Sequence, residues 1–194
     1  MPRPKQRTPE LRDRLLRAAI DTLTDGGIAG FTTRRVAAGA ETSVPAVYEL
    51  FGDKAGLARE IFFEGFRRLG GMLRAVPDGA DPRHDLVCTI DAFREFVRHN
   101  PELVEVMFGR PFADFDPGRG ERAAGDVVRE TLTGRVRRCV EAGELDGDPT
   151  DLAHVLIAVA QGLARQEVAG WLGVTEVERD RRWSLAFERV LRAP

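Results

Sequence analysis

The sequence is poor in the residues that build reactive or cross-linked sites. Its 194 residues include two cysteines, three histidines, one tyrosine and two lysines among 29 basic residues. Cys88 and Cys139 lie far apart and form no CxxC pair. We therefore interpret both as buried thiols and predict neither a disulfide nor a metal site.

The usual catalytic patterns are also missing. Ser43 and Ser184 are the only serines, and neither stands in a nucleophile elbow. The histidines do not follow HExxH spacing, and no glycine-rich phosphate loop occurs. We predict a protein that is not an enzyme, with no catalytic residues and no cofactor.

Long apolar runs are absent as well. None approaches the length that crosses a bilayer, and the basic N-terminal stretch MPRPKQRTPELRDR lacks the apolar segment of a signal peptide. With 43% hydrophobic and 31% charged residues, the composition is that of an ordinary globular protein. A cytoplasmic location without a membrane partner is the expectation.

The net charge of −2 conceals an asymmetry between the two ends. Residues 1–59 carry 10 basic and 7 acidic side chains (+3), whereas residues 60–194 carry 19 and 24 (−5). A mildly basic N-terminal part is a weak sign of contact with nucleic acid, and simple solvation of a charged face explains it equally well.

The apolar spacing predicts an all-α protein. Alternating Val, Ile and Thr runs bounded by hairpin turns are missing, so no sheet is expected. Thr8 and Thr32 are candidate N-caps, and Gly26-Gly27 is expected to end the first helix. The helices predicted are 9–25, 33–40, 44–51, 54–75, 83–99, a short one from 101, 121–142, 150–172 and 175–192.

The break at Gly52-Asp53 divides the chain into two parts. Residues 1–52 are predicted to form a domain of three helices, and residues 53–194 a second helical domain.

The segment 31–51 has the parts of a helix-turn-helix, which needs a short first helix, a tight turn and a second helix that enters the major groove. Small or apolar residues on the first helix allow close crossing: Val36, Ala37 and Ala40. Residues of the second helix expected to turn inward are Val47, Leu50 and Phe51. Those left to face outward are Val44, Pro45, Ala46 and Tyr48.

This segment resembles the N-terminal domain of the TetR family of transcriptional regulators. The residues in register with the family pattern are Thr32, Val36-Ala37, Ala40, Ser43, Val47-Tyr48, Phe51, Lys54 and Leu57. The match covers residues 8–66, about a third of the chain, and the remainder resembles the family only in its all-helical form.

The resemblance implies a sequence-specific DNA-binding transcriptional regulator. Residues 1–52 would form its DNA-binding helix-turn-helix domain, and residues 53–194 a helical domain for ligand binding and dimerisation. It favours a small-molecule-responsive repressor that acts as a homodimer on a double-stranded DNA operator. The alternative is a helical regulator that acts by protein contact without binding DNA.

Carried onto this chain, the resemblance assigns the DNA contacts. Hydroxyls, free N–H groups at a helix start and a lysine can hold phosphates, and the residues implied are Thr32, Thr33, Ser43, Tyr48 and Lys54. Apolar residues contact thymine methyls, and those at the tip of the second helix are Val44, Pro45 and Ala46. Guanine or a narrow minor groove would be read by Arg34 or by the N-terminal arm of Arg3, Lys5 and Arg7. Simple capping by Thr32 and simple packing by Tyr48 remain the structural alternatives.

Glu41 departs from the family pattern, which has glycine between the two helices. A positive φ at this turn would cost a glutamate about 1 kcal/mol, and its charge would lie near the phosphates.

The resemblance also implies a small apolar ligand in the second domain. Its pocket is predicted from aromatic residues with few polar ones, and a plain aromatic core is the alternative. The residues assigned to it are Phe62, Phe66, Phe93, Phe96, His99, Met107, Phe108 and Phe112.

The predicted helix 150–172 is apolar on more than one face and must be covered on more than one side. Packing of the last two helices on their copies in a second chain would cover it. The residues assigned to this dimer interface are Val155, Val159, Gly162, Leu163, Trp171, Trp183 and Phe187.

Overall fold

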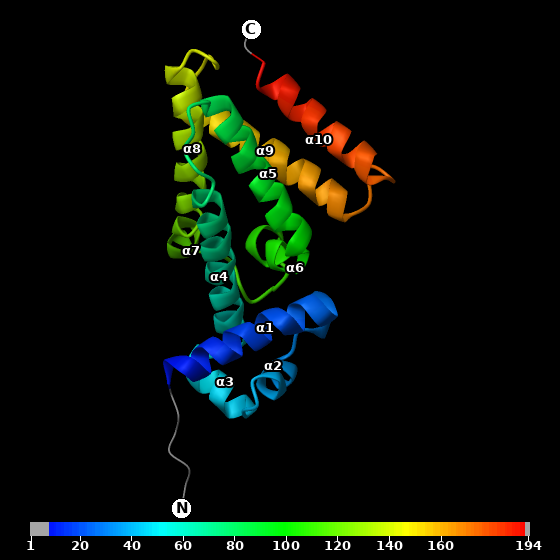
Figure 1. Cartoon of the computed structure of the whole chain (residues 1–194). Helices are drawn as coiled ribbons and strands as arrows, with labels where there is room; N and C mark the ends of the chain where they lie inside the picture. The colour runs from blue at the N-terminus through cyan, green and yellow to red at the C-terminus, as the bar shows by residue number, and fades with distance from the viewer. Residues whose placement is uncertain (1–7, 193–194) are drawn as a thin grey trace, which may run out of the picture. The chain divides into compact units, whose positions relative to one another are not determined.

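The computed structural model describes residues 8–192, and it is helical with no strand in that range. The all-α prediction is therefore confirmed. No helix among these residues is long and apolar enough to cross a membrane. The elements, labelled in Figure 1, are α1 Pro9–Gly30, α2 Thr33–Gly39, α3 Val44–Phe51, α4 Lys54–Arg74, α5 Pro82–His99, α6 Pro101–Val104, the π-helical turn η1 Glu105–Gly109, α7 Arg119–Ala123, α8 Asp126–Glu141, α9 Pro149–Val168 and α10 Glu176–Val190.

Side-chain caps fix where several helices begin. The Thr8 hydroxyl accepts from the Leu11 N–H, and the Thr32 hydroxyl accepts from the Arg35 N–H, so both predicted caps are confirmed. At α10, the Thr175 hydroxyl accepts from Glu178 N while the Glu178 carboxylate accepts from Thr175 N. Each such cap satisfies N–H groups that have no partner inside the helix.

The first helix is broken where its end is predicted, at Gly27 (φ 58°, ψ −168°), and helical backbone resumes beyond this kink as far as Gly30. Two other predicted boundaries are wrong. The helix predicted for 150–172 ends at Val168. The single helix predicted for 121–142 is two helices, α7 and α8. Between α6 and α7 the backbone passes through η1 and then through Arg110, which has a positive φ of 52°.

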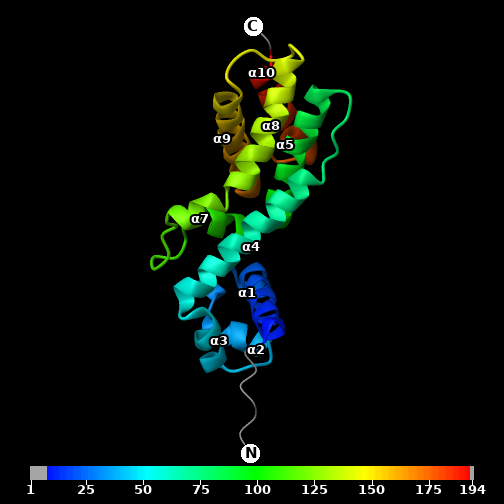
Figure 2. The ribbon, with the colours of Figure 1, turned by 90° about the vertical axis from the view of Figure 1, so that its left-hand side faces the viewer.

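The first compact unit runs to Gly65 and also includes Glu102–Arg122. Figures 1 and 2 show α1, α2 and α3 grouped at the N-terminal end of α4. Gly39 allows α2 to approach α1 closely, since a Cβ there would lie 3.3 Å from the Ala18 Cβ. The largest side chains with under 2% exposure in this unit are Leu15, Leu23, Phe31, Val36, Val47, Leu57, Ile61 and Val106.

Residues 102–122 pack onto the first half of α4 within this unit. A Cβ on Gly65 would lie 2.5 Å from the Met107 sulfur, so only glycine leaves room for that side chain. Phe115 meets Phe62 edge to face at 5.6 Å between ring centroids. This division falls at Gly65 rather than at Gly52, and the functional division into 1–52 and 53–194 stays a prediction.

The second compact unit comprises Phe66–Pro101 and the chain from Ala123 onward. Here α5, α8 and α9 pack on one another, and α10 packs on α9. Asp85, 5% exposed, accepts hydrogen bonds from Gly79 N and from the Arg138 guanidinium, both at 2.8 Å. These bonds hold the loop before α5 against α5 itself, and α5 against α8.

The two cysteines differ in exposure. Cys139 is buried and free, as predicted, whereas Cys88 is only half-buried, so that prediction is wrong for Cys88. Burial, with the nearby Glu144 carboxylate, raises the pKa of Cys139 to about 11. Its thiol therefore stays protonated at neutral pH.

We expect the native protein to show one fast thiol per chain with Ellman's reagent at pH 8. A pKa of about 11 leaves Cys139 roughly one part in a thousand thiolate at that pH, and the thiolate is the reactive form. Both thiols should react once the chain is unfolded in denaturant. The Cys88→Ser variant should show no fast thiol, and two fast thiols in the native protein would contradict the burial of Cys139.

Candidate nucleic-acid interface

The turn between α2 and α3 closes with two backbone hydrogen bonds. The Glu41 N–H donates to Ala38 O at 3.0 Å, and the Thr42 N–H donates to Ala37 O at 2.9 Å. This is the Schellman pattern, in which the residue just past the helix end is left-handed and usually glycine. Glu41 occupies that position with φ 52°. The positive φ suspected at this turn is therefore present in a non-glycine residue.

Two hydroxyls from different helices meet at the outer surface. Thr33 Oγ1, in the first turn of α2, lies 3.4 Å from the Tyr48 hydroxyl on α3. The Tyr48 side chain is 45% exposed, while Val47 and Phe51 on the same helix are buried. The tertiary fold thus brings together two residues that the sequence separates by fifteen positions. Thr32 acts as the cap of α2, because its hydroxyl accepts from Arg35 N at 3.3 Å.

The start of α3 presents a polar and an apolar group to solvent. Ser43 is the N-cap residue, makes no side-chain capping hydrogen bond and is exposed. Pro45 therefore stands second in the helix, after Val44. Pro45 is exposed, whereas Val44 and Ala46 are half-buried. All four residues lie at the end of α3 that follows the turn.

Lys54 begins α4 and lies over two aromatic rings. Its Nζ is 5.6 Å from the centroid of Phe31 and 5.4 Å from that of Phe112. These are cation–π distances, and such a contact contributes about 0.5–1 kcal/mol at an exposed site. The sequence did not indicate this contact, because Phe112 lies 58 residues further along the chain.

The two arginines of α2 have different surroundings. Arg34 is exposed, as a DNA contact requires. Arg35 turns back, and its Nη1 donates to Gly30 O at 3.2 Å. Space for it depends on glycines, since a Cβ on Gly26 or Gly30 would lie 2.5 or 2.6 Å from that nitrogen. Arg3, Lys5 and Arg7 lie outside the described residues.

Arg12 supports the recognition helix, a role that the sequence analysis missed. Its Nη1 donates to Leu50 O at 3.3 Å, its Nη2 lies 2.6 Å from the Glu60 carboxylate, and its guanidinium carbon is 5.0 Å from the Phe51 ring centroid. On the sequence, Arg12 is one of several charged residues on α1. Only the crossing of α1, α3 and α4 distinguishes it from a solvated side chain.

The predicted ligand residues divide between the two compact units. Those in the first unit are Phe62, Met107, Phe108 and Phe112; those in the second are Phe66, Phe93, Phe96 and His99. All are buried except Phe108, which is half-buried, and His99, whose side chain is 72% exposed. Their assignment to a pocket stays a prediction.

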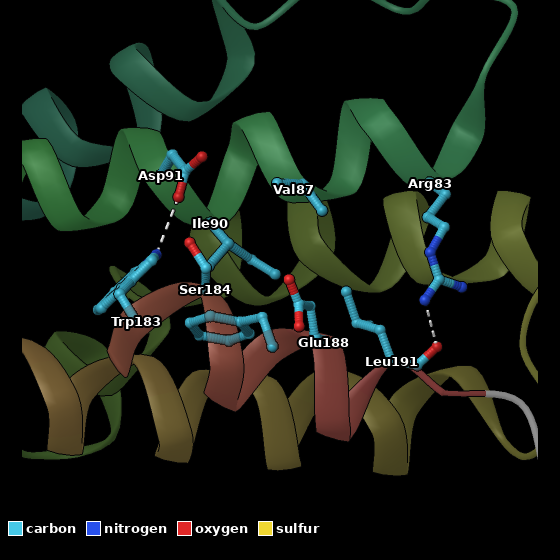
Figure 3. A pocket seen from close by; sticks show the side chains of 9 residues that line it. Arg83, Val87, Ile90, Asp91, Trp183, Ser184, Glu188 and Leu191 are labelled. Carbon is cyan, nitrogen blue, oxygen red and sulfur yellow. Dashed lines mark hydrogen bonds between the residues drawn. The ribbon is translucent and has the colours of Figure 1, made fainter. Parts of the chain in front are cut away.

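A cavity of about 250 Å³ lies elsewhere, between α5 and α10 (Figure 3). Arg83 is near one end, where its Nη2 donates to Leu191 O at 2.6 Å. Near the other end the Trp183 indole donates to Asp91 Oδ1 at 2.9 Å. The apolar wall between them consists of Val87, Ile90, Trp183, Phe187 and Leu191.

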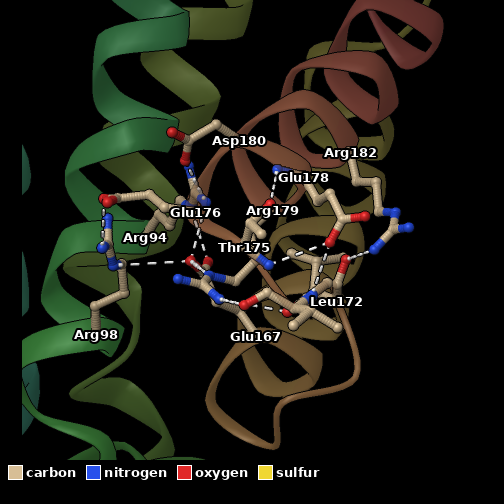
Figure 4. Close-up of polar contacts among 12 residues, drawn as sticks. Arg94, Arg98, Glu167, Leu172, Thr175, Glu176, Glu178, Arg179, Asp180 and Arg182 are labelled. Carbon is tan, nitrogen blue, oxygen red and sulfur yellow. Dashed lines mark hydrogen bonds and ion pairs between the residues drawn. The ribbon is translucent and has the colours of Figure 1, made fainter.

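A buried ion pair joins the helices beside this cavity. The Arg94 guanidinium donates two hydrogen bonds to Glu167, at 2.7 and 2.9 Å, and lies 2.8 Å from Asp180 (Figure 4). Its carbon is also 4.9 Å from the Trp183 ring centroid. Since Arg94, Glu167 and Asp180 belong to α5, α9 and α10, this cluster fixes the three helices together.

Trp183 and Phe187 do not belong on a partner-facing surface. Their rings lie 5.0 Å apart, and the residues are 3% and 4% exposed within the chain itself. Their placement in the dimer interface is therefore wrong, because α5 and α9 already cover them. Apolar side chains that are exposed on and around the last two helices are Val155, Val168, Trp171, Val174, Val177 and Leu185.

A three-helix unit that presents a short helix with exposed hydroxyls after a tight turn defines a helix-turn-helix DNA-binding protein. The family model described as "Bacterial regulatory proteins, tetR family" matches residues 15–61, and "Tetracyclin repressor-like, C-terminal domain" matches residues 86–191. The chain belongs to the TetR family, and it is a DNA-binding transcriptional regulator. Members of this family bind DNA operators and typically form homodimers.

Comparisons with individual proteins agree with membership of the TetR family. The HTH-type transcriptional repressor KstR of Mycolicibacterium smegmatis is 26% identical over 166 residues, which cover 84% of this chain and 77% of that protein. A solved protein of unknown function from Rhodococcus sp. RHA1 is 24% identical, with 97% of both chains covered and a TM-score of 0.81. The TetR family regulator PfmR of Thermus thermophilus is 22% identical, with 93% and 98% covered and a TM-score of 0.69. The two solved structures show the shared fold.

We expect Glu41→Gly to raise the free energy of unfolding by about 1 kcal/mol, because glycine adopts a positive φ without strain. It should also tighten operator binding about two- to fivefold by removing a negative charge beside the phosphates. Urea denaturation and fluorescence anisotropy with labelled operator DNA would measure the two effects.

Glu41→Gln separates charge from strain, because it removes the charge and keeps a side chain at the positive φ. It should tighten DNA binding as the glycine variant does while leaving the stability unchanged. Equal stabilisation by both variants would show that the backbone at position 41 is not strained.

Proposed function

We propose that this regulator is a ligand-responsive repressor that binds its operator through the surface formed by α2, α3 and the start of α4. The observation that carries the proposal is the convergence of the Thr33 and Tyr48 hydroxyls, 3.4 Å apart, on one exposed surface. Two such donors can bind neighbouring oxygens of one phosphodiester strand.

The proposed phosphate contacts differ in kind. Thr33 and Tyr48 contribute hydroxyls, and Ser43 contributes one that no capping bond occupies. Thr32 orders the helix start, so that the free N–H groups of α2 face a phosphate. Lys54 contributes a charge. These contacts fix the register of the protein on the duplex and carry no sequence information.

Sequence would be read by the tip of α3. The exposed Pro45, with the half-buried Val44 and Ala46, offers apolar surface to thymine methyl groups. None of the three can form the bidentate hydrogen bonds that recognise guanine or adenine, whereas the exposed Arg34 can reach guanine. We therefore propose an operator in which thymines face α3.

Among the two possible modes of regulation, the named relatives support repression rather than activation. KstR, a protein 26% identical to this chain, is named a transcriptional repressor. A dimer that covers an operator excludes other proteins from it by occupancy alone. No observation favours the alternative of a regulator that works without DNA. A bacterial regulator of this kind would work in the cytoplasm, where the chromosome lies.

Release of the operator by a ligand requires a difference in the ligand's affinity for two states of the protein. A small apolar molecule can release the operator only if it binds the DNA-incompetent state more tightly than the DNA-bound state. The aromatic residues assigned to the pocket stay part of this proposal. The cavity beside Trp183 provides a second location that fluorescence can distinguish, because a ligand there would contact one of only two tryptophans in the chain.

We expect the protein to protect a discrete site in footprinting on DNA that flanks its own gene. Lys54→Ala and Tyr48→Phe should weaken binding to all sequences alike, because they remove phosphate contacts. Lys54→Ala should also reduce the slope of log K against log salt by about 1. Candidate apolar ligands should release the same site.

Arg137→Ala is the charge control, because Arg137 is exposed on α8 and has no assigned DNA role. It should leave the affinity and the salt slope unchanged. Unchanged binding in both Lys54→Ala and Tyr48→Phe would refute their roles. If no ligand releases the protected site, the proposed repression stands and the proposed response to a ligand is refuted.

The dimer interface is proposed on the outer surface of α9 and α10. Trp171 is 83% exposed, Val174 90% and Val177 77%, and exposed apolar groups of this size mark contact surfaces. From the predicted set we keep Val155, Val159, Gly162, Leu163 and Trp171, and we add Val177 and Leu185. Gly162 is exposed, and a Cβ on it would meet no atom within 4 Å. It allows a second helix to approach the backbone closely.

We expect Gly162→Arg to convert the dimer to monomers at micromolar concentration in sedimentation velocity. The open space around Gly162 admits the side chain in a single chain, and arginine favours helix over glycine by about 1 kcal/mol, so folding should not suffer. Gly71→Arg is the matched control, because Gly71 is also helical, exposed and free of neighbours within 4 Å. A Gly162→Arg protein that remains dimeric would exclude this surface.

A further inference from the structure

Phe112 connects a segment outside the helix-turn-helix to the DNA-binding surface. It lies beyond η1, it is 8% exposed, and its ring meets that of Phe31 at 5.3 Å with a tilt of 48°. Phe31 is 1% exposed and directly precedes Thr32, the cap of α2. The two rings form one aromatic surface beside the start of α2.

The Lys54 ammonium lies against this surface. Its distances to the two ring centroids, 5.4 and 5.6 Å, differ by only 0.2 Å, so both rings hold it. Within the described part of the chain no carboxylate forms an ion pair with Lys54, although Arg12 and Arg59 in the same unit each have one. The lysine is exposed, and its charge is therefore held by ring faces on one side and open to solvent on the other.

An aromatic holder differs from a carboxylate in its effect on a phosphate contact. A carboxylate would neutralise the ammonium and compete with the phosphate for its hydrogens. A ring face attracts the cation through its quadrupole and leaves the charge in place. It also restricts a flexible side chain, whose rotamer entropy would otherwise be lost on DNA binding.

The position of Phe112 depends on the packing of its own segment. Met107 fits against Gly65, and Phe115 packs on Phe62, so the segment contacts α4 on both sides of Phe112 in the sequence. Between these contacts the backbone passes through the π-helical turn and the positive φ of Arg110. Irregular geometry of this kind is common at functional sites.

We propose that Phe112 is a positioning residue for DNA binding: together with Phe31 it holds the Lys54 ammonium ready for a backbone phosphate. The segment 102–122 then contributes to operator affinity without contacting DNA. A shift of this segment that withdrew the Phe112 ring would weaken DNA binding through Lys54. This inference rests on the proposed phosphate contact of Lys54.

A double-mutant cycle on the full-length protein tests the proposal. Phe112→Leu keeps an apolar side chain and removes the ring face, and it should weaken binding about two- to fivefold on operator and unrelated DNA alike. Phe112→Trp keeps a ring face at this position and should bind DNA as tightly as the native protein. In the Lys54→Ala background, Phe112→Leu should cause no further loss, because the side chain that it positions is absent.

Phe187→Leu is the matched control, since it removes a buried ring that packs on Trp183 in the second unit. It should leave DNA affinity unchanged. A second readout needs no DNA: lysine labelled with ¹³C gives signals from only two residues, Lys5 and Lys54. The Lys54 Cε protons should be shifted upfield by the rings, and Phe112→Leu should reduce that shift.

The outcomes separate the two proposals. If Lys54→Ala weakens binding but Phe112→Leu does not, or if the two losses add, the positioning role is overturned and the phosphate contact stands. If Lys54→Ala leaves binding unchanged, the phosphate contact fails and this inference fails with it. An unshifted Lys54 signal in the native protein would overturn the aromatic contact itself.

Discussion

The helices α2 and α3 have only seven and eight residues, and helices this short are unstable alone in water. The free-energy cost of nucleating a helix exceeds the stabilisation that so few hydrogen bonds provide. The existence of both helices depends on burial of one side, of α2 against α1 and of α3 against α2. Val36 and Val47 are fully buried, and the absence of a side chain on Gly39 lets α2 approach α1. The groups proposed to contact DNA lie on the opposite sides of these helices. The geometry of the DNA-binding surface is therefore set by a small apolar core that contacts no DNA.

The backbone of the turn between these helices is strained at Glu41, and a glycine at that position would fold into the same turn without strain. Glycine at position 41 would adopt φ 52° freely, whereas glutamate there is destabilised and adds a negative charge. The other positive φ outside glycine, at Arg110, lies in the segment that carries Phe112, so both strained residues are close in sequence to groups proposed to act on DNA binding.

The second unit is held differently. Its apolar core is supplemented by ion pairs around three buried charges. Arg94 and Glu167, with the exposed Asp180, join α5, α9 and α10, and Asp85 with Arg138 joins α5 to α8. Removing one partner of such a cluster leaves an uncompensated charge, which is strongly destabilising, while the clusters themselves specify one arrangement of helices. The outer surface of α9 and α10 carries the exposed Val155, Val177 and Leu185, which belong to the proposed dimer interface.

Local signals in the sequence were sufficient for the helix-turn-helix and for the class of protein. The caps at Thr8 and Thr32, the inward Val47 and Phe51 and the register with the TetR pattern depend on residues within a few positions of one another. The same local logic correctly located the unusual turn at Glu41.

Long-range contacts decided the rest. No periodicity indicates that Arg12 supports α3, that Phe112 reaches Lys54, or that Trp183 and Phe187 are covered by their own chain. Each depends on which helices cross, and an amphipathic pattern shows that a face is buried without showing what buries it. The sequence by itself determined the helix-turn-helix and the family. The tertiary structure decided which aromatic and charged side chains serve the interior and which remain available to DNA or to a second chain.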